Sequence, residues 1–200
     1  MIHFSNSDTK RSIGSIYDGL KPSQRKILYC CFKRKLYQEI RVAQLAGYVS
    51  EHAAYHHGEA SLQSTIIGMA QVFTGTNNIN LLKPNGQFGS RIMGGADSAS
   101  PRYIHTELNK IVNLIYPIED FPLLNYENDD GLIVEPTYYV PVIPMVLVNG
   151  MKGIGTGFST DIPQFNPIEV IDNIENKING LDYKEIIPWY KGFDGIIQKI

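Results

Sequence analysis

The chain has 200 residues, of which 43% are hydrophobic and 19% are charged, a composition typical of one large globular domain or two small ones. No stretch approaches the roughly 20 apolar residues that a membrane-spanning helix needs, and the polar segment 1–11 lacks the apolar core of a secretory signal. The net charge of −2 hides a division, because residues 1–112 hold thirteen Lys and Arg against seven Asp and Glu, whereas residues 113–200 hold five against thirteen. This division predicts either one face that meets a polyanion or a solvated charged surface.

Two helices with a short connection are expected in the basic half. The first begins at Pro22, since the fixed φ of proline suits a first helical turn. Its apolar residues share one face: Ile27, Leu28, Cys31 and Phe32. Its basic residues lie largely outside that face: Arg25, Lys26, Lys33 and Arg34. The second helix begins at Arg41, with apolar residues at helical spacing, so helix-turn-helix geometry is plausible.

Residues 59–117 are expected to hold two further helices with loops between them. The third helix spans Glu59 to Phe73, and Glu59 complements the positive N-terminal end of its dipole. The Gly- and Asn-rich segment 74–95 predicts loops and short strands, a candidate wing. The fourth helix begins at Arg102 and ends at Pro117. Its apolar residues fall at helical spacing: Leu108, Ile111, Val112 and Ile115.

Beyond residue 117 the sequence changes in character. Segment 131–148 is rich in β-branched and aromatic residues but is interrupted by prolines, which predicts strand pieces near sheet edges. Residues 153–157, GIGTG, are expected to form a tight glycine loop. A last helix is expected over 167–178, with four isoleucines along it.

Tyr103, within the segment SPRYIH (100–105), is the first candidate for chemistry. In the first turn of the fourth helix it would lie near unpaired N–H groups and the positive dipole end, which favour a phosphate nearby. Arg102 would add a forked donor to the phosphate oxygens, and a phenol becomes a good nucleophile once a neighbour accepts its proton or stabilises the phenolate. The alternative is a tyrosine that plugs the start of the helix into the core.

Two histidines precede the third helix, in the segment YHHGE (55–59). They could shuttle protons or bind phosphate. The alternatives are structural histidines bonded to backbone groups, or a metal site made by His52 and His56, which no nearby cysteine or carboxylate cluster completes. The adjacent Cys30 and Cys31 form no CxxC pattern and are interpreted as packing residues of a reduced protein.

Two further features could meet nucleic acid. The glycine loop matches neither GxGxxG nor the GxxxxGK of a nucleotide-binding loop, so it is a weak phosphate cradle. Its Ile154 is instead a candidate apolar wedge, a side chain that kinks DNA by inserting between base pairs, with a packed turn residue as the alternative. On the first helix, Lys21, Arg25 and Lys26 predict a phosphate-binding face.

Six segments together resemble the type IIA DNA topoisomerases, specifically the eukaryotic topoisomerase II branch and its relatives in large DNA viruses. They occur in family order and at family-like spacing: DGLKPSQRK (18–26), AQLAG (43–47), YHHGE (55–59), GQFGSR (86–91), DSASPRY (97–103) and GIGTG (153–157). The resemblance covers nearly the whole chain and weakens only after about Leu181. Six ordered motifs are far more specific than any one of them.

The resemblance implies a DNA-cleaving role. Tyr103 would attack a DNA phosphodiester and form a 5′-phosphotyrosyl link, which the 3′-hydroxyl later reverses, while Arg102 stabilises charge on the reacting phosphate. Arg11 and His57 match the remaining catalytic basic positions of the family. Ile154 matches the isoleucine that intercalates and bends the duplex. The implied DNA contacts are Lys21, Gln24, Arg25 and His56.

The fold implied by the resemblance is α+β: a winged-helix (helix-turn-helix) DNA-cleavage domain over 1–116 and the beginning of a β-rich tower domain over 117–200. The implied cofactors are Mg²⁺, held by a separate acidic module, and ATP; Asp129-Asp130 lies in the wrong motif context to hold the metal. The implied partners are double-stranded DNA and a second copy in a homodimer, with no membrane, in the nucleus or at a site of viral replication. The chain is expected to be a fragment that binds DNA but cleaves it poorly alone. The rival hypotheses are a non-catalytic winged-helix DNA-binding module and a structural dimerisation piece without DNA affinity.

Overall fold

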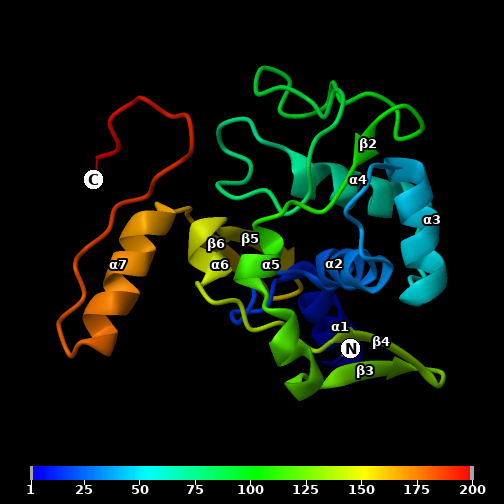
Figure 1. The fold of residues 1–200 in the computed structure, drawn as a ribbon, viewed down its shortest axis with the longest axis horizontal. Coiled ribbons are helices and arrows are strands. Elements are labelled where there is room, and N and C mark those ends of the chain that lie inside the picture. The colour runs from blue at the N-terminus through cyan, green and yellow to red at the C-terminus, as the bar shows by residue number, and fades with distance from the viewer. Residues whose placement is uncertain (1, 199–200) are drawn as a thin grey trace.

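The computed structural model describes residues 2–198 as helices, two-stranded antiparallel sheets and long loops (Figure 1). The helices are α1 (Ile2–Ser12), α2 (Pro22–Arg34), α3 (Val42–His52), α4 (Glu59–Ala70), α5 (Val112–Ile115), the 3-10 helix η1 (Ile118–Leu123), α6 (Met145–Val148) and α7 (Pro167–Ile178). The strands pair as β1 (Ile40–Arg41) with β2 (His105–Thr106), β3 (Tyr126–Asp129) with β4 (Leu132–Pro136), and β5 (Met151–Gly155) with β6 (Phe158–Ile162). This mixture of helices and small sheets agrees with the α+β class.

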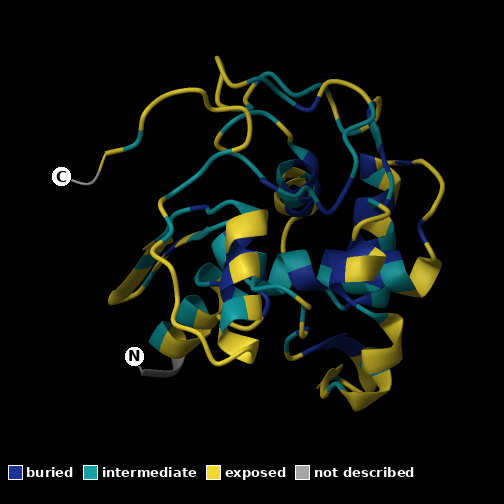
Figure 2. Ribbon diagram, turned by 60° about the vertical axis from the view of Figure 1, so that its left-hand side comes forward, coloured by how far each residue is buried: buried dark blue, intermediate teal, exposed yellow. Residues whose placement is uncertain are grey.

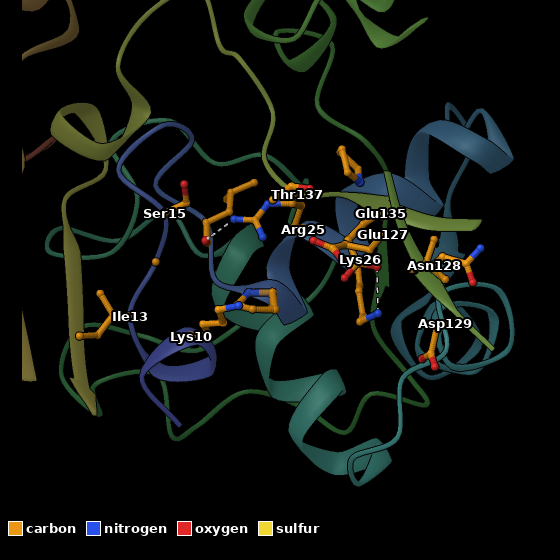
Figure 3. Close-up of a pocket in the computed structure, with 15 residues that line it drawn as sticks. Lys10, Ile13, Ser15, Arg25, Lys26, Glu127, Asn128, Asp129, Glu135 and Thr137 are labelled. Atoms are coloured by element: carbon orange, nitrogen blue, oxygen red, sulfur yellow. Dashed lines mark hydrogen bonds and ion pairs between the residues drawn. The ribbon is translucent and has the colours of Figure 1, made fainter. Parts of the chain in front are cut away.

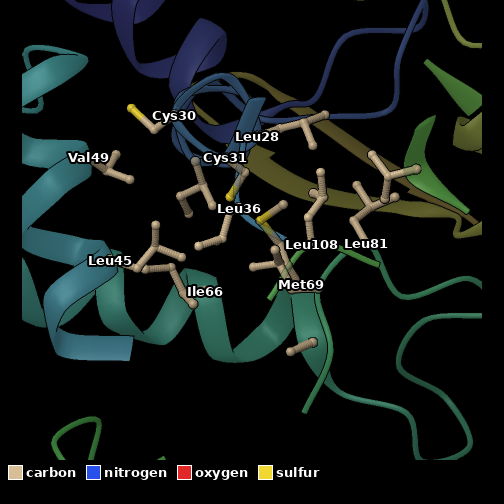
Figure 4. Close-up of a cluster of buried hydrophobic side chains, with 14 of the residues drawn as sticks. Leu28, Cys30, Cys31, Leu36, Leu45, Val49, Ile66, Met69, Leu81 and Leu108 are labelled. Carbon is tan, nitrogen blue, oxygen red and sulfur yellow. The ribbon is translucent and has the colours of Figure 1, made fainter. Parts of the chain in front are cut away.

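Helix α2 lies in the centre of the core, because α3, α4 and β4 all pack against it. Ile27, Leu28, Cys30 and Cys31 of α2 are buried, and Phe32 is partly buried. Leu28, Cys30 and Cys31 meet side chains of α3 and α4 (Figure 4). Cys30 and Cys31 are both free and buried, which confirms that they are packing residues. Desolvation raises the pKa of the Cys30 thiol to about 12 and that of Cys31 still higher, so both stay uncharged at neutral pH.

The periodicity of the sequence located four helices correctly. Pro22 and Pro167 stand in the first turns of α2 and α7, and the side chain of Asn166 caps α7 by accepting a hydrogen bond from the Ile168 amide at 2.9 Å. Helix α4 ends at Ala70 rather than at Phe73. The reason is that the Asn77 side chain returns to donate to the carbonyl groups of this helix end, which turns the chain away.

Helix α1, at the polar start of the chain, was not predicted. Three predictions about the elements were wrong. Residues 153–155, expected in a tight glycine loop, belong to strand β5. No helix begins at Arg102 among the described residues, because His105–Thr106 is extended and pairs with β1, and the helix is reduced to α5. Residues 145–148, expected as part of a strand region, form the short helix α6.

The buried core extends across residue 116, where a domain boundary was predicted. Tyr139, Met145 and Val148 belong to the same buried cluster as residues of α2 and α3. The ribbon coloured by burial shows buried stretches both in helices and in the loops between them (Figure 2). The two predicted domains, 1–116 and 117–200, therefore share part of one core, and the boundary itself stays a prediction. Within the part of the chain that the structure describes, none of the helices has the length and apolar character to span a bilayer.

Candidate nucleic-acid interface and cleavage site

An open pocket of about 560 Å³ lies between the C-terminal end of α1, the N-terminal end of α2, the α3–α4 connection and β5. We call it the basic pocket. Five of the nine residues predicted from the sequence line it: Arg11, Lys21, His56, His57 and Ile154. Residues far apart in the sequence thus converge on one concave surface, where five basic side chains, Lys26 included, face a single carboxylate, that of Asp129. Such a surface suits a phosphate backbone.

Ile154 is presented to solvent by the β5–β6 hairpin. Its side chain is 77% exposed, so the alternative of a packed turn residue was wrong. The glycines on either side have a structural cause: a Cβ at Gly153 would collide with the Ser12 carbonyl, and one at Gly155 would lie 3.1 Å from Thr9 Cα. The glycine motif therefore lets β5 press directly against the backbone of α1 instead of cradling a phosphate.

The paired histidines have different neighbours. His56 Nε2 lies 2.9 Å from Asp129 Oδ2, at the end of β3. His57 contacts the ring of Tyr55 edge-on, with ring centroids 5.5 Å apart. His52 does not join them, since its Nδ1 lies 3.0 Å from the Tyr48 carbonyl one turn back along α3. The metal site considered for His52 and His56 therefore has no support.

Arg25 requires a correction. Its guanidinium is buried and donates to Asp18 through Nε at 2.7 Å and Nη2 at 3.0 Å. It also donates to the Leu20 carbonyl at 2.8 Å, the dashed line at Arg25 in Figure 3. Asp18 is completely buried, and a carboxylate in that environment needs a paired cation. The direct DNA contact predicted for Arg25 is not available in this arrangement, and we assign it a structural role.

The other polar residues of α2 divide between the surface and the interior. Lys26, expected on the basic exterior, donates to Glu135 at 2.8 Å (Figure 3). It also donates to the Ala53 carbonyl at 2.6 Å, so its charge is largely neutralised. Gln24 lies outside the basic pocket and accepts a hydrogen bond from the Lys21 amide at 2.8 Å, which caps the helix. The Lys21 side chain stays on the wall of the pocket.

Tyr103 lies in a tight turn and not in a helix. Its amide donates to the Ser100 carbonyl at 2.9 Å, and its side chain is 78% exposed, so the alternative of a tyrosine buried in the core was wrong. The nearest positive helix end belongs to α3, whose first two N–H groups donate to the carbonyls of Pro101 and Ile104 at 3.0 and 3.1 Å. The turn is therefore held against the N-terminus of α3, with Arg102 beside the phenol in sequence.

The basic pocket and Tyr103 lie at opposite ends of α3. The turn that carries Tyr103 is bonded to the start of this helix, whereas His56 and His57 follow its end. An 11-residue helix is roughly 16 Å long, at 1.5 Å per residue. A single chain thus brings Arg11 and His57 together but does not bring Tyr103 and Arg102 to them.

Comparison with known proteins identifies the family of the chain. The sequence profile of the family that comprises the A subunits of DNA gyrase and topoisomerase IV matches residues 11–200. The chain belongs to the type IIA DNA topoisomerases. The DNA topoisomerase 2 of Candida albicans is 58% identical over 197 residues, which cover 98% of this chain and 14% of that protein. That of Arabidopsis thaliana is 56% identical over 199 residues, or 100% of this chain and 14% of the relative.

A solved structure matches this topoisomerase chain throughout. The crystal structure of the Plasmodium falciparum topoisomerase II DNA-binding, cleavage and re-ligation domain is similar with a TM-score of 0.97 and 55% sequence identity. The match covers 98% of this chain and 27% of that chain. The arrangement of helices and hairpins described above is therefore a topoisomerase II arrangement. The chain spans about 14% of the length of the two curated relatives.

The Mg²⁺ that the topoisomerase family implies has no fitting site among residues 2–198. No group of three or more His, Cys, Asp or Glu side chains converges there. Asp129, which lines the basic pocket, is engaged with His56, and Asp8 on α1 is engaged with Thr156.

Two polar residues of this topoisomerase site were missed by reasoning from the sequence. Asp129 contacts His56 from 73 positions away, and Asp8 contacts Thr156 from 148 positions away. Neither pair has a local sequence signal, because each depends on how a hairpin folds back onto a distant helix. Both carboxylates are visible in the sequence, but their partners are not.

Proposed function

We propose that this chain supplies the DNA-cleaving tyrosine, Tyr103, of a type II DNA topoisomerase. One observation carries the proposal: the Tyr103 side chain is 78% exposed on a turn next to Arg102, in a chain that matches a topoisomerase II cleavage domain throughout. An exposed phenol at that place can reach a duplex without any rearrangement of the core. A DNA-binding module without catalytic activity would not require an exposed tyrosine next to an arginine at this position.

The proposed reaction is a transesterification. The Tyr103 phenolate oxygen attacks the phosphorus of one DNA phosphodiester, the bond to the 3′-oxygen breaks, and that oxygen gains a proton as the phenol loses one. The 5′-phosphate then remains on the tyrosine. Attack by the 3′-hydroxyl reverses both changes and restores the DNA. Arg102 donates to the non-bridging oxygens, where negative charge grows in the transition state.

We assign Arg11 and His57 to the same reaction, with charge stabilisation as their role. Because the basic pocket and Tyr103 are separated by the length of α3, a complete centre requires the tyrosine of one copy to meet the pocket of another. The homodimer implied by the family resemblance would supply that second copy. Lys21, Gln24 and His56 are proposed to contact the DNA backbone around it.

The finer architecture is proposed on the same grounds. Residues 1–116 would form a winged-helix cleavage domain, supported by the packing of α2 against α3 and by the β1–β2 pair, and residues 117–200 would begin a tower domain. Mg²⁺ and ATP are proposed as cofactors held by other parts of the enzyme. The enzyme would act on double-stranded DNA in the nucleus or at a site of viral replication.

Mapping the covalent adduct tests the proposal. The full-length protein is incubated with duplex DNA, trapped with denaturant, and digested with protease and nuclease before mass spectrometry. We expect a nucleotide on the peptide that contains Tyr103, and DNA ends that resist a 5′-exonuclease but not a 3′-exonuclease. The remaining tyrosines, among the twelve of the chain, serve as internal controls. An adduct on another tyrosine, or a blocked 3′ end, would reject the assignment.

Ile154→Ala is expected to reduce DNA bending. The isoleucine is exposed at a hairpin edge beside the basic pocket, and an apolar wedge contributes by partly unstacking a base step. Bending a short duplex costs roughly 1–6 kcal/mol, so the bent fraction should fall several-fold. End-to-end FRET on a labelled duplex bound to the full-length protein measures it. Ile168→Ala, which alters an exposed isoleucine on α7, is the matched control, and equal bending by both variants would remove the wedge assignment.

A further inference from the structure

Asp8, on α1, connects two parts of the DNA-facing surface. Its Oδ2 accepts hydrogen bonds from the Thr156 amide at 2.9 Å and the Thr156 hydroxyl at 2.8 Å. Its Oδ1 lies 3.3 Å from Arg11 Nη2. One carboxylate therefore holds the tip of the β5–β6 hairpin with one oxygen and the arginine of the basic pocket with the other.

The same two elements are in direct backbone contact. Because Gly153 and Gly155 have no side chains, β5 lies against α1 at Ser12 and Thr9. The Ser5 hydroxyl also donates to the Thr156 carbonyl at 3.2 Å. Helix α1 and the hairpin can thus move only together, as long as the tip of the hairpin stays bound to the helix.

The charge of Asp8 suits this role. The side-chain hydrogen bond from Thr156 lowers the pKa of the Asp8 carboxyl, with further lowering by the Thr156 amide and by Arg11. The carboxylate is therefore ionised at neutral pH and can accept all three contacts at once. An ion pair between Asp8 and Arg11 alone, three residues apart on an exposed helix, would contribute little. The second partner is what gives the carboxylate a fixed position.

We propose that Asp8 is a positioning residue that fixes the catalytic arginine Arg11 relative to the DNA-bending residue Ile154. Ile154 lies two residues before Thr156 in the hairpin, and both Ile154 and Arg11 line the basic pocket. Insertion of Ile154 into the duplex would push on the hairpin, and Asp8 would transmit that displacement to Arg11. The bend and the placement of charge at the reacting phosphate would then be coupled. This inference rests on the proposed function.

The test measures bending and cleavage in the same full-length protein. Bending is followed by FRET on a labelled duplex, and cleavage by the covalent complex trapped at saturating DNA. We expect Asp8→Ala to lower the bent fraction several-fold, by no more than Ile154→Ala does, and to lower the covalent complex in proportion, since charge-assisted hydrogen bonds to both elements are lost. In an Ile154→Ala background, Asp8→Ala should cause no further loss of bending.

A graded pair of variants at Thr156 separates positioning from folding. Thr156→Ser keeps the hydroxyl and should behave like the parent protein, whereas Thr156→Val keeps only the amide and should fall between the parent and Asp8→Ala. If Asp8→Ala does not fold, these two variants decide. Weaker bending and cleavage by Thr156→Val than by Thr156→Ser support the proposal, and equal bending and cleavage by both overturn it.

The matched control is Asp161→Asn, which breaks an exposed ion pair with Lys152 on the same hairpin but does not touch α1. Two results would overturn the proposal. In the first, Asp8→Ala bends and cleaves DNA as well as this control does. In the second, Asp8→Ala loses cleavage while its bending is unchanged. The proposed function fails by a different result. A covalent complex that persists after Tyr103→Phe would reject the role of Tyr103, while the bending measurement would still test Asp8.

Discussion

Replacing Tyr103 with phenylalanine should abolish covalent capture of DNA by the full-length protein. The change removes one oxygen atom from a side chain that is largely exposed and packs against little, so the fold and the affinity for DNA should change hardly at all. The covalent complex should fall by at least about 1,000-fold, in the range seen when the nucleophile of an enzyme is removed. Denaturant trapping followed by gel separation of protein-linked DNA measures it.

Tyr37→Phe is the control for this variant. Tyr37 is also exposed, but it follows α2 and lies outside the motifs that resemble the topoisomerases. We expect its covalent complex to equal that of the parent protein. Binding of both variants should weaken with added salt to the same degree, because phosphate contacts remain. Undiminished covalent complex in Tyr103→Phe would reject the nucleophile, and lost binding would point to a structural role for the phenol.

Asp18→Ala should be the most damaging substitution for the stability of the fold. Asp18 accepts from Arg25, from the Leu20 amide at 2.9 Å and from the Tyr139 amide at 2.9 Å, all in the interior. Its removal leaves the Arg25 cation buried without its carboxylate, a loss of about 3–5 kcal/mol. Amide hydrogen exchange in α2 should therefore accelerate by roughly two orders of magnitude or more, which peptide-resolved mass spectrometry of the full-length protein would show.

The control for Asp18→Ala is Lys152→Ala. Lys152 pairs with Asp161 at 3.1 Å, but both side chains are exposed, and such pairs contribute about 0–1 kcal/mol. Exchange in α2 should be unchanged by this variant. If Asp18→Ala also left exchange in α2 unchanged, the ion pair would not hold Arg25 in place, and its guanidinium would be free to contact DNA.

The elements that the sequence located are those with an apolar stripe. Helices α2, α3 and α4 bury such a stripe, so their periodicity was readable without the structure. Helix α7 was located by its first-turn proline and the spacing of its isoleucines, although Ile168 and Ile178 are exposed. Helix α1 was missed because it packs against β5 through its backbone, where glycines make room, and needs no stripe there. The helix expected from Arg102 was wrong because pairing with β1 outweighs the spacing of the apolar residues.

The residues of the site were found as a set of motifs, but their mutual arrangement was not. The motifs predicted that Arg11, His57 and Tyr103 belong to one function. They did not reveal that Tyr103 and the basic pocket lie at opposite ends of α3. That separation arises because β2 pairs with β1, which holds the turn of Tyr103 at the start of α3. Arg25 was misassigned for a similar reason, because nothing around it in sequence reveals that Asp18 is buried.

The contact between α1 and the β5–β6 hairpin determines how much of the start of this chain a shortened protein must keep. A start codon placed after Ser12 would remove the helix that covers β5 and leave the main chain of Gly153 and Gly155 uncovered on that face of the hairpin. Recombinant versions that start at Ile13 should therefore hold the hairpin less firmly, and amide exchange in β5 should be faster than in versions that retain the first twelve residues.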